Sequence, residues 1–178
     1  MPLLEMTGVN KRYGGVRALV DASLSVERAQ VHGLLGPNGS GKSTLNKVLT
    51  GTVQPDSAHV RLDGDDVAIR RPLDAYRLRI AAVYQQLSLI PQLTVAQNLQ
   101  LGTEASRGGV VDDRRGRERA AAALEPFLPG LDAGVGLNTE VSRLSPSSRQ
   151  LVEIAKAVGR DPAFWCWMRP RRRYDAIR

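Results

Sequence analysis

The chain has 178 residues, of which 42% are hydrophobic and only 4% aromatic. This composition suits one domain with a mostly aliphatic core and excludes wholesale disorder. The formal net charge of +7 suggests nucleic-acid binding, but five arginines and a single acid, Asp175, lie in residues 169–178. The rest of the chain is close to neutral, so the basicity belongs to the tail.

Two observations bear on the compartment. The one cysteine, Cys166, cannot form an internal disulfide, which is typical of a reducing environment. The opening MPLLEMTGV lacks a basic start followed by an apolar run, and no stretch approaches the ~20 apolar residues of a membrane-spanning helix. We therefore expect a cytoplasmic protein that reaches a membrane only through a partner.

The hydrophobic pattern predicts an α/β protein. Residues 3–28 alternate in patches around the turn Gly14-Gly15, which favours short antiparallel strands. Residues 31–35 form a compact apolar run that ends at a glycine, a pattern typical of a buried parallel strand. From Ser43 the pattern becomes helical, and Gly51 is placed to end that helix.

The later elements are shorter or less regular. We expect a hairpin over 58–69 around Asp63-Gly64, a strand over 80–84, a helix entered at 94–101, a loop over 102–117, a helix over 117–128, and a helix over 147–158 with Leu151, Ile154, Ala155 and Val158 facing the core. No internal repeat is present in the sequence.

The segment GPNGSGKST fits the G-x-x-x-x-G-K-[ST] pattern of a phosphate-binding loop. Glycines let successive backbone N–H groups close around phosphate oxygens at the positive end of the following helix. Lys42 can reach the β and γ phosphates, and the Ser43 hydroxyl can bind Mg²⁺. A chance glycine-rich turn is the alternative, but a strand before it and a helix after it favour a nucleotide site. The predicted site comprises Gly36, Pro37, Asn38, Gly39, Ser40, Gly41, Lys42, Ser43 and Thr44.

With this motif in place, residues 4–163 resemble the nucleotide-binding subunits of ABC transporters. Tyr13 in NKRYGGVRAL is similar to the family's aromatic residue that stacks on adenine. The alternative is a tyrosine that simply packs at a strand edge. The segment DAYRLRIAAVYQQLSLIPQLTVAQN is most similar to the ATP-binding subunits of ribose- and xylose-type importers, which commonly carry two cassettes in tandem.

Two further motifs extend the resemblance. Gln85 in VYQQLSLIPQLTV resembles the family's glutamine that touches Mg²⁺ and relays the nucleotide state to the membrane subunit, with Gln86 as the competing position. The stretch LSPSSRQLVEIAKAV resembles the signature region that caps the γ-phosphate held by the opposite cassette. Ser145 is retained there, but Pro146 removes one backbone donor and Ser147 and Ser148 also depart from the usual motif.

The resemblance implies an α/β fold, a P-loop NTPase core with an antiparallel β lobe and a helical subdomain, incomplete at the C-terminus. The core and β lobe would occupy 1–88 and 158–168, the helical subdomain with the signature-like motif 89–157, and a basic tail 169–178. ATP and Mg²⁺ are the implied cofactors, with Lys42 and Gln85 as catalytic residues and Ser43 and Gln85 as metal ligands.

The implied function is ATP hydrolysis that drives import of a sugar or similar small solute. The partners would be a membrane permease and a second cassette, and the protein would lie peripherally at the inner face of the cell membrane. Two alternatives remain: a nucleotide-binding fragment without hydrolysis, and a nucleic-acid-associated ABC protein. The position of the positive charge in the tail argues against nucleic acid.

The family's catalytic Asp-Glu pair, which follows an apolar strand, is missing after Asp161-Pro162-Ala163. In a neighbouring reading frame, the codons for Phe-Trp-Cys-Trp-Met encode Leu-Val-Leu-Asp, whichever synonymous codons are used. A glutamate follows if Arg169 is encoded by AGA or AGG. We therefore expect a truncation or frameshift after about residue 163, in the gene or in its sequencing, and weak hydrolysis by the chain as written.

Overall fold

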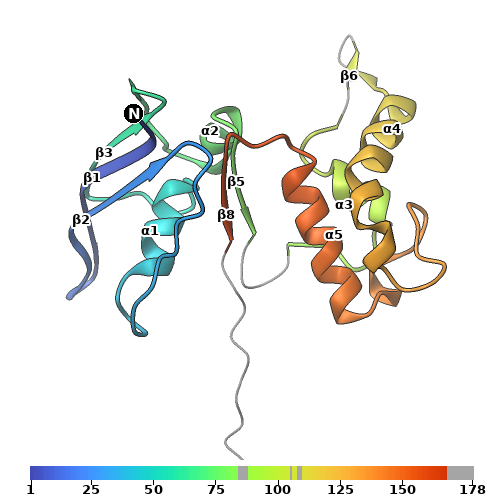
Figure 1. Cartoon of the computed structure of the whole chain (residues 1–178), viewed down its shortest axis with the longest axis horizontal. Helices are drawn as coiled ribbons and strands as arrows, with labels where there is room; N and C mark the ends of the chain where they lie inside the picture. Colours follow the sequence, from blue (N-terminus) through green and yellow to red (C-terminus); the bar gives the residue numbers. More distant parts are fainter. Residues whose placement is uncertain (84–87, 105, 108–109, 168–178) are drawn as a thin grey trace, which may run out of the picture. The chain divides into compact units, whose positions relative to one another are not determined.

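The computed structural model describes residues 1–83, 88–104, 106–107 and 110–167. The chain divides into two compact units, Met1–Ala81 and Ala82–Arg178. Figure 1 shows the elements of each unit in chain order. None of the described helices is both long enough and apolar enough to cross a membrane.

An antiparallel sheet with strand order β2-β1-β3-β4 forms much of the first unit (Figure 1). Its strands are β1 (Pro2–Tyr13), β2 (Val16–Glu27), β3 (Ser57–Leu62) and β4 (Asp65–Asp66). Leu4 and Met6 of β1 are fully buried because alternate residues face one side of a sheet. The predicted strands around Gly14-Gly15 are confirmed, although each is twelve residues long rather than short.

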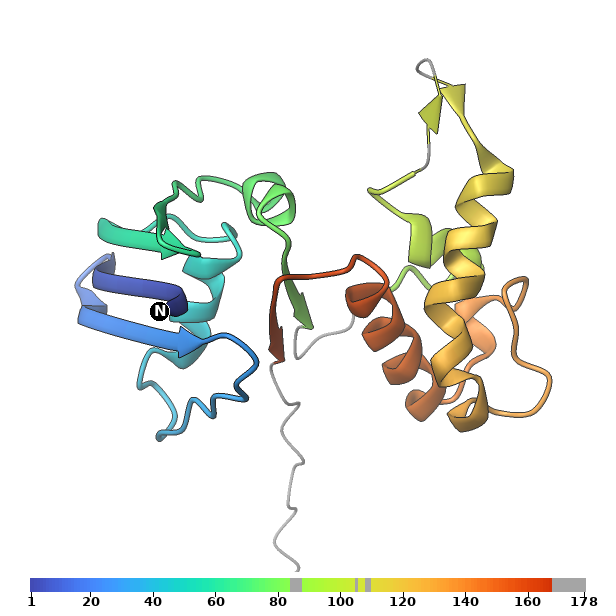
Figure 2. The same cartoon turned by 45° about the horizontal axis from the view of Figure 1, so that its top comes forward.

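Helix α1 (Lys42–Leu49) follows the glycine-rich loop and buries Leu45, Val48 and Leu49. Figure 2 shows this helix beside the sheet of the first unit. Gly51 ends the helix with a φ of +68°, and a Cβ there would lie 2.5 Å from the carbonyl of Arg71. The predicted helix and its glycine stop are confirmed.

The predicted hairpin at Asp63-Gly64 is also confirmed, although β4 is only two residues long. Asp63 and Gly64 have φ values of +54° and +89°, and a two-residue hairpin with both central residues at positive φ favours this sequence pair. Helix α2 (Pro72–Arg77) comes next, and its Asp74 carboxylate accepts the Arg71 N–H at 3.1 Å.

Residues 31–35 do not form the buried parallel strand that their apolar run predicts. The segment lies outside every strand, and Val31 and Leu35 are 104% and 91% exposed. A buried parallel strand depends on hydrogen-bonded neighbours and on cover for both faces. The sheets of the described chain do not include this segment, so its apolar composition could not fix a pairing partner.

A second sheet pairs β5 (Ile80–Val83) with β8 (Phe164–Trp167). Strand β5 confirms the strand predicted over 80–84 as far as Val83, since residue 84 lies outside the described chain. In β8 the alternate residues Phe164 and Cys166 are half-buried, whereas Trp165 and Trp167 are exposed with stacked rings 6.2 Å apart. Strand β8 therefore has two different faces.

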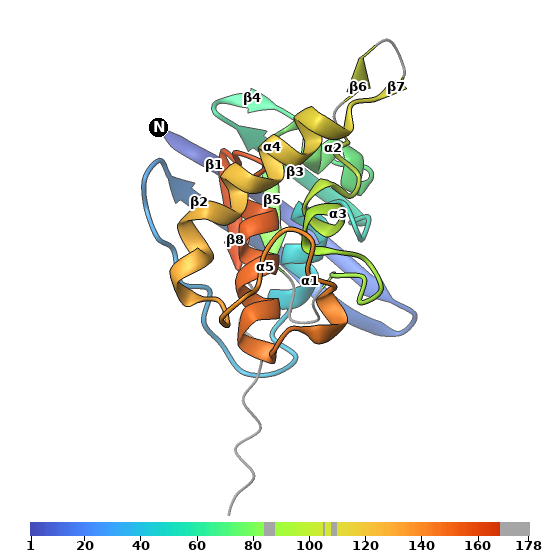
Figure 3. The same cartoon turned by 90° about the vertical axis from the view of Figure 1, so that its right-hand side faces the viewer.

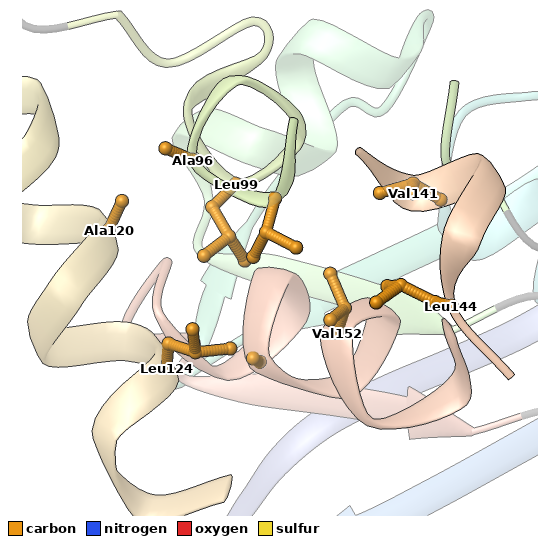
Figure 4. Close-up of a cluster of buried hydrophobic side chains, with 9 residues drawn as sticks. Ala96, Leu99, Ala120, Leu124, Val141, Leu144 and Val152 are labelled. Atoms are coloured by element: carbon orange, nitrogen blue, oxygen red, sulfur yellow. The ribbon is translucent and has the colours of Figure 1, made fainter. Parts of the chain in front are cut away.

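Three helices give the second unit its core: α3 (Val95–Gln100), α4 (Asp113–Leu124) and α5 (Pro146–Val158). Figure 3 shows these helices, with the short strands β6 (Ser106–Arg107) and β7 (Val110–Val111) between α3 and α4. Two short 3₁₀ helices, η1 (Glu125–Gly130) and η2 (Val141–Arg143), lie between α4 and α5 in the chain. The apolar faces of α3, α4 and α5 meet in one cluster of aliphatic side chains (Figure 4). The cluster consists of Val95, Ala96, Leu99, Ala120, Leu124, Val141, Leu144, Val152 and Ala155.

The loop predicted over 102–117 is wrong in part. Two short antiparallel strands, β6 (Ser106–Arg107) and β7 (Val110–Val111), lie within it, and α4 begins at Asp113 instead of residue 117. The reason is the N-cap residue Asp112, whose carboxylate accepts the Arg115 N–H at 3.0 Å. The arginines at 114, 115 and 117 therefore lie on a helix, exposed to solvent.

The predicted core face of α5 is also partly wrong. Ala155 is buried, but Leu151 and Ile154 are half-buried and Val158 is 42% exposed. Val152, which the sequence analysis did not select, is fully buried. The buried face of this helix also includes charged and small residues. A prediction from the spacing of apolar residues alone therefore places the buried face about one residue away from its observed position.

Candidate functional site

Glycine conformations shape the loop before α1. Gly39 and Gly41 have φ values of +82° and +85°, and Gly36 has +151°, all in regions that residues with a side chain rarely adopt. The Ser40 N–H donates to the Pro37 carbonyl at 3.4 Å and closes a turn. The loop is exposed as far as Ser40 and leads directly into α1. This is the loop-to-helix arrangement that the motif predicts.

Gly41 also makes a close approach to strand β2. A Cβ at this position would lie 2.7 Å from both the Ala18 carbonyl oxygen and the Leu19 Cδ2 atom. The Gly41 carbonyl accepts the Leu45 N–H at 2.8 Å, the bond that opens the helix. Both the backbone conformation and the lack of space therefore require glycine.

The Lys42 ammonium group lies against the loop that precedes it. Nζ donates to the carbonyls of Gly36 and Pro37, each at 2.6 Å, and to Ser40 Oγ at 3.1 Å. A charged donor bound to carbonyl oxygens makes strong hydrogen bonds. The loop therefore already holds a cation where the motif needs one for phosphate oxygens, and the residues present fit a polyphosphate ligand.

The remaining motif residues lie close by. Pro37 and Asn38 are exposed in the loop, Ser43 is exposed in the first turn of α1, and Thr44 is half-buried. An exposed hydroxyl in the first helical turn fits a ligand of Mg²⁺, a cation that prefers oxygen ligands.

Tyr13 ends strand β1 and is 46% exposed. The Lys11 ammonium lies 5.6 Å from the centroid of the Tyr13 ring, a cation–π distance. The ring is therefore not packed in the core of its unit. Its role in stacking on adenine stays a prediction.

A pocket beside the end of β1 was missed by the sequence analysis. The Asp56 carboxylate accepts the Arg12 N–H at 2.7 Å and Lys11 Nζ at 3.3 Å, and the Arg12 bond holds the pKa of Asp56 below its ordinary value. Arg12 and Arg17 face each other in the β1–β2 register, so only strand pairing brings their charges together. The lining residues are Asn10, Lys11, Arg12, Arg17, Leu19, Val20 and Asp56.

In the signature-like motif, Ser145 caps helix α5. Its Oγ accepts the Ser148 N–H at 3.2 Å, and its backbone is extended as an N-cap requires. Pro146 occupies the first helical position, where a backbone N–H has no helical partner in any case. The proline therefore starts the helix and does not interrupt it.

Asp132, which bonds to the signature-like motif, was also missed by the sequence analysis. Its carboxylate accepts Ser148 Oγ at 2.7 Å and the Ser145 N–H at 3.4 Å. Hydrogen bonds from Ser145 and Ser148 hold the pKa of Asp132 below its ordinary value. Ser148 itself is fully buried, which explains why a small hydroxyl stands here. No local pattern links residues this far apart in sequence.

The structure places residues 36–44 in the glycine loop and the first turn of α1, within the first unit, and places Ser145 in the second unit. Gln85, and its competitor Gln86, lie outside the described residues. The roles predicted for these two glutamines stay predictions.

Comparison with known proteins supplies the family. Residues 19–167 match the family described as ABC transporter, which is more than half of the chain. This chain belongs to the ABC transporter family. The match includes the glycine loop, the signature-like motif and strand β8.

The most similar relatives include two ATP-binding proteins of sugar import. The ribose import ATP-binding protein RbsA 1 of Rubrobacter xylanophilus is 48% identical over 89% of this chain and 31% of its own length. The arabinose import ATP-binding protein AraG of Azospirillum brasilense is 46% identical over 90% of this chain and 30% of its own length. The chain thus spans about a third of the curated relatives that it matches.

Solved structures agree with this assignment. A nucleotide-free ATP-binding cassette from an ABC transporter matches with a TM-score of 0.80 and 27% identity, over 94% of this chain and 68% of that one. A cassette in its ADP conformation matches with a TM-score of 0.77 over 97% of this chain and 82% of its own length. At 24% identity the second match shows the fold alone. The P-loop NTPase fold that the sequence predicts is confirmed.

Proposed function

We propose that this chain is part of the ATP-binding subunit of an ABC importer for a monosaccharide or a similar small solute. The observation that carries the proposal is the Lys42 ammonium, held by carbonyls within a glycine loop at a helix N-terminus. The ribose and arabinose import proteins, 48% and 46% identical, support the choice of solute class.

Each motif residue has a role in this proposal. Lys42 and the backbone N–H groups of residues 36–44 bind the phosphates, and Tyr13 stacks on the adenine ring. Ser43 and Gln85 hold Mg²⁺, which when bound neutralises phosphate charge. Ser145 and the start of α5 contact the nucleotide held by a second cassette, since a helix N-terminus attracts phosphate.

The partners follow from the same reasoning. A permease in the membrane would provide the solute path, and a second cassette would complete each nucleotide site. The chain would lie at the inner face of the membrane and contact it only through the permease.

A second candidate is nucleotide binding without hydrolysis. Strand β8 reads Phe164-Trp165-Cys166-Trp167, with no carboxylate to polarise an attacking water. A cassette with an intact glycine loop and no such base would bind Mg-ATP and leave it largely unhydrolysed.

The decisive experiment measures affinity for a fluorescent ATP analogue with Mg²⁺ present. Lys42→Ala removes a charged hydrogen-bond donor and should weaken binding about 10- to 100-fold. Lys47→Ala is the matched control, because Lys47 is an exposed lysine in the last turn of the same helix. Equal affinity for the wild-type chain and Lys42→Ala would contradict the proposed site.

A further inference from the structure

Strand β1 continues beyond the point where β3 stops pairing with it. The last register pair of these two strands is Asn10 with Ser57, whereas β1 runs on to Tyr13 and turns back into β2 at Val16. Residues 12–17, the end of this hairpin, are all exposed. A two-stranded ribbon by itself is only marginally stable in water. A Tyr13 ring that stacks on a base in one orientation therefore requires a further contact to hold the hairpin end.

Asp56, the residue before β3, supplies that contact. Its N–H donates to the Asn10 carbonyl at 2.8 Å, and its carboxylate accepts the Arg12 N–H at 2.7 Å and Lys11 Nζ at 3.3 Å. Hydrogen bonds to a charged acceptor are stronger than bonds between neutral groups. The carboxylate thus extends the hold on β1 by two residues beyond its last backbone pair with β3.

One of these bonds leads to the Tyr13 ring. The ammonium of Lys11 lies over this ring, 5.6 Å from its centroid, and the lysine side chain is only 17% exposed. An unrestrained lysine side chain samples many rotamers, so an ammonium that stays over the ring depends on the carboxylate that binds it. Asp56 therefore holds both the backbone before Tyr13 and the cation over its ring.

The same hairpin lies against the end of the glycine loop. Leu19 of β2 is the register partner of Lys11, and a Cβ built at Gly41 would lie 2.7 Å from Leu19 Cδ2. The hairpin that carries Tyr13 and the loop to which the proposed function assigns the phosphates are thus neighbours within the first unit. This proximity is what one nucleotide requires if its phosphates bind the loop and its base binds the hairpin.

We propose that Asp56 is a positioning residue for the nucleotide base: it fixes the end of the β1–β2 hairpin so that Tyr13 presents its ring to adenine. This inference rests on the proposed function for the stacking role of Tyr13, whereas the clamp itself rests on the bonds of Asp56. Stacking of a base on an aromatic side chain typically contributes about 5- to 150-fold in affinity. Loss of the clamp should lower this contribution and leave phosphate binding by the glycine loop unchanged.

The test compares the affinities of the full chain for ATP and for tripolyphosphate, which lacks the nucleoside, by calorimetry at one Mg²⁺ concentration. The ratio of the two dissociation constants measures the gain that the nucleoside provides. Asp56→Ala removes both carboxylate bonds and should lower this gain about fivefold, with tripolyphosphate affinity unchanged. Asp65→Ala makes the same chemical change at an exposed residue of β4 and should match the wild-type chain.

A double-mutant cycle shows whether Asp56 acts through Tyr13. Tyr13→Ala should remove most of the gain, and the further change Asp56→Ala should then leave ATP affinity as it is, because the ring to be positioned is missing. Hydrogen exchange at the Arg12 amide tests the clamp without nucleotide. Exchange there should accelerate in Asp56→Ala and keep the wild-type rate in Asp65→Ala.

Several results would overturn the inference. An unchanged gain in Asp56→Ala, or unchanged exchange at Arg12, would show that the carboxylate does not hold the hairpin end. Equal losses of ATP and tripolyphosphate affinity, or equal losses with and without the Tyr13 ring, would reduce Asp56 to a structural residue. A wild-type chain that binds tripolyphosphate as tightly as ATP would refute the base contact but not the phosphate loop. A wild-type chain that binds neither would contradict the proposed function as a whole.

Discussion

At Gly41 the backbone has a positive φ and no room for a side chain. The φ is +85°, and a Cβ would lie 2.7 Å from backbone and side-chain atoms of β2. Gly39 has nearly the same φ, +82°, but nothing within 4 Å of a built Cβ. Alanine at position 39 would therefore face only an unfavourable backbone conformation, whereas alanine at position 41 would also clash with neighbouring atoms.

Gly41→Ala should therefore destabilise the first unit more than Gly39→Ala. Positive φ alone costs about 1 kcal/mol for an alanine, and overpacking adds about 1–3 kcal/mol at position 41. Urea unfolding monitored by circular dichroism measures both variants. Equal midpoints would show that the contact with β2 relaxes freely.

Cys166 gives the clearest pH dependence at the residue scale. Burial raises the pKa of its thiol from 9.0 to about 11. Because only the thiolate is a nucleophile, the native chain should react with iodoacetamide at pH 8 about a hundredfold more slowly than the urea-unfolded chain. The alkylation rate of the native chain should rise until the pH passes about 11.

In the unfolded chain the thiol ionises at lower pH than in the native chain. Raising the pH from 9.0 to about 11 should therefore lower the free energy of unfolding. Equal alkylation rates for native and unfolded chains would contradict the buried thiol.

At the scale of elements, the three helices of the second unit depend on one aliphatic cluster. Leu124 of α4 belongs to that cluster (Figure 4) and is 2% exposed. Leu128 of η1 is 48% exposed. The two leucines are one helical turn apart in sequence. They therefore form a natural pair for measuring how much the cluster stabilises its helices.

Leu124→Ala should destabilise the second unit by about 2–5 kcal/mol, because it removes buried methyl groups and leaves a cavity. Leu128→Ala should change stability by less than about 0.5 kcal/mol, as surface substitutions usually do. Thermal unfolding followed by circular dichroism distinguishes them. A small effect at both positions would mean that the cluster does not hold α4 in place.

At the scale of the whole molecule, we expect the chain to bind nucleotide without hydrolysing it. The glycine loop and Lys42 are present, whereas β8 carries Trp and Cys in the region where the family's acidic pair is expected. We expect the 178-residue chain to bind Mg-ATP and release almost no phosphate, since β8 carries no carboxylate that could activate a water molecule.

Expression of the neighbouring reading frame from codon 164 tests this expectation. If Arg169 is encoded by AGA or AGG, the shifted chain reads Leu-Val-Leu-Asp-Glu and should release more phosphate in a coupled assay than the chain as written. Rapid turnover by the chain as written would contradict the prediction. Resequencing codons 160 to 172 shows whether the shift lies in the gene.

Local chemistry made part of this molecule predictable. The glycine loop, the helix stop at Gly51 and the hairpin at Asp63-Gly64 each depend on backbone conformations that only a few residue types adopt. Thr94 caps α3 by the same short-range rule. The sequence could specify these features because every interacting group lies within a few residues.

Long-range contacts decided the rest. Residues 31–35 are apolar enough for a strand, but pairing partners elsewhere determine whether a strand forms. The bonds of Asp132 to Ser148 and of Glu153 to Ser88 join residues 16 and 65 positions apart. No periodicity records such pairs, because a buried polar group is stabilised by whichever partner the fold brings within hydrogen-bond distance. The sequence alone determined that a glycine loop with the phosphate-binding pattern is present and that the chain belongs to the ABC transporter family. The tertiary structure decided which polar side chains bond to α5, because those partners lie far away in the sequence.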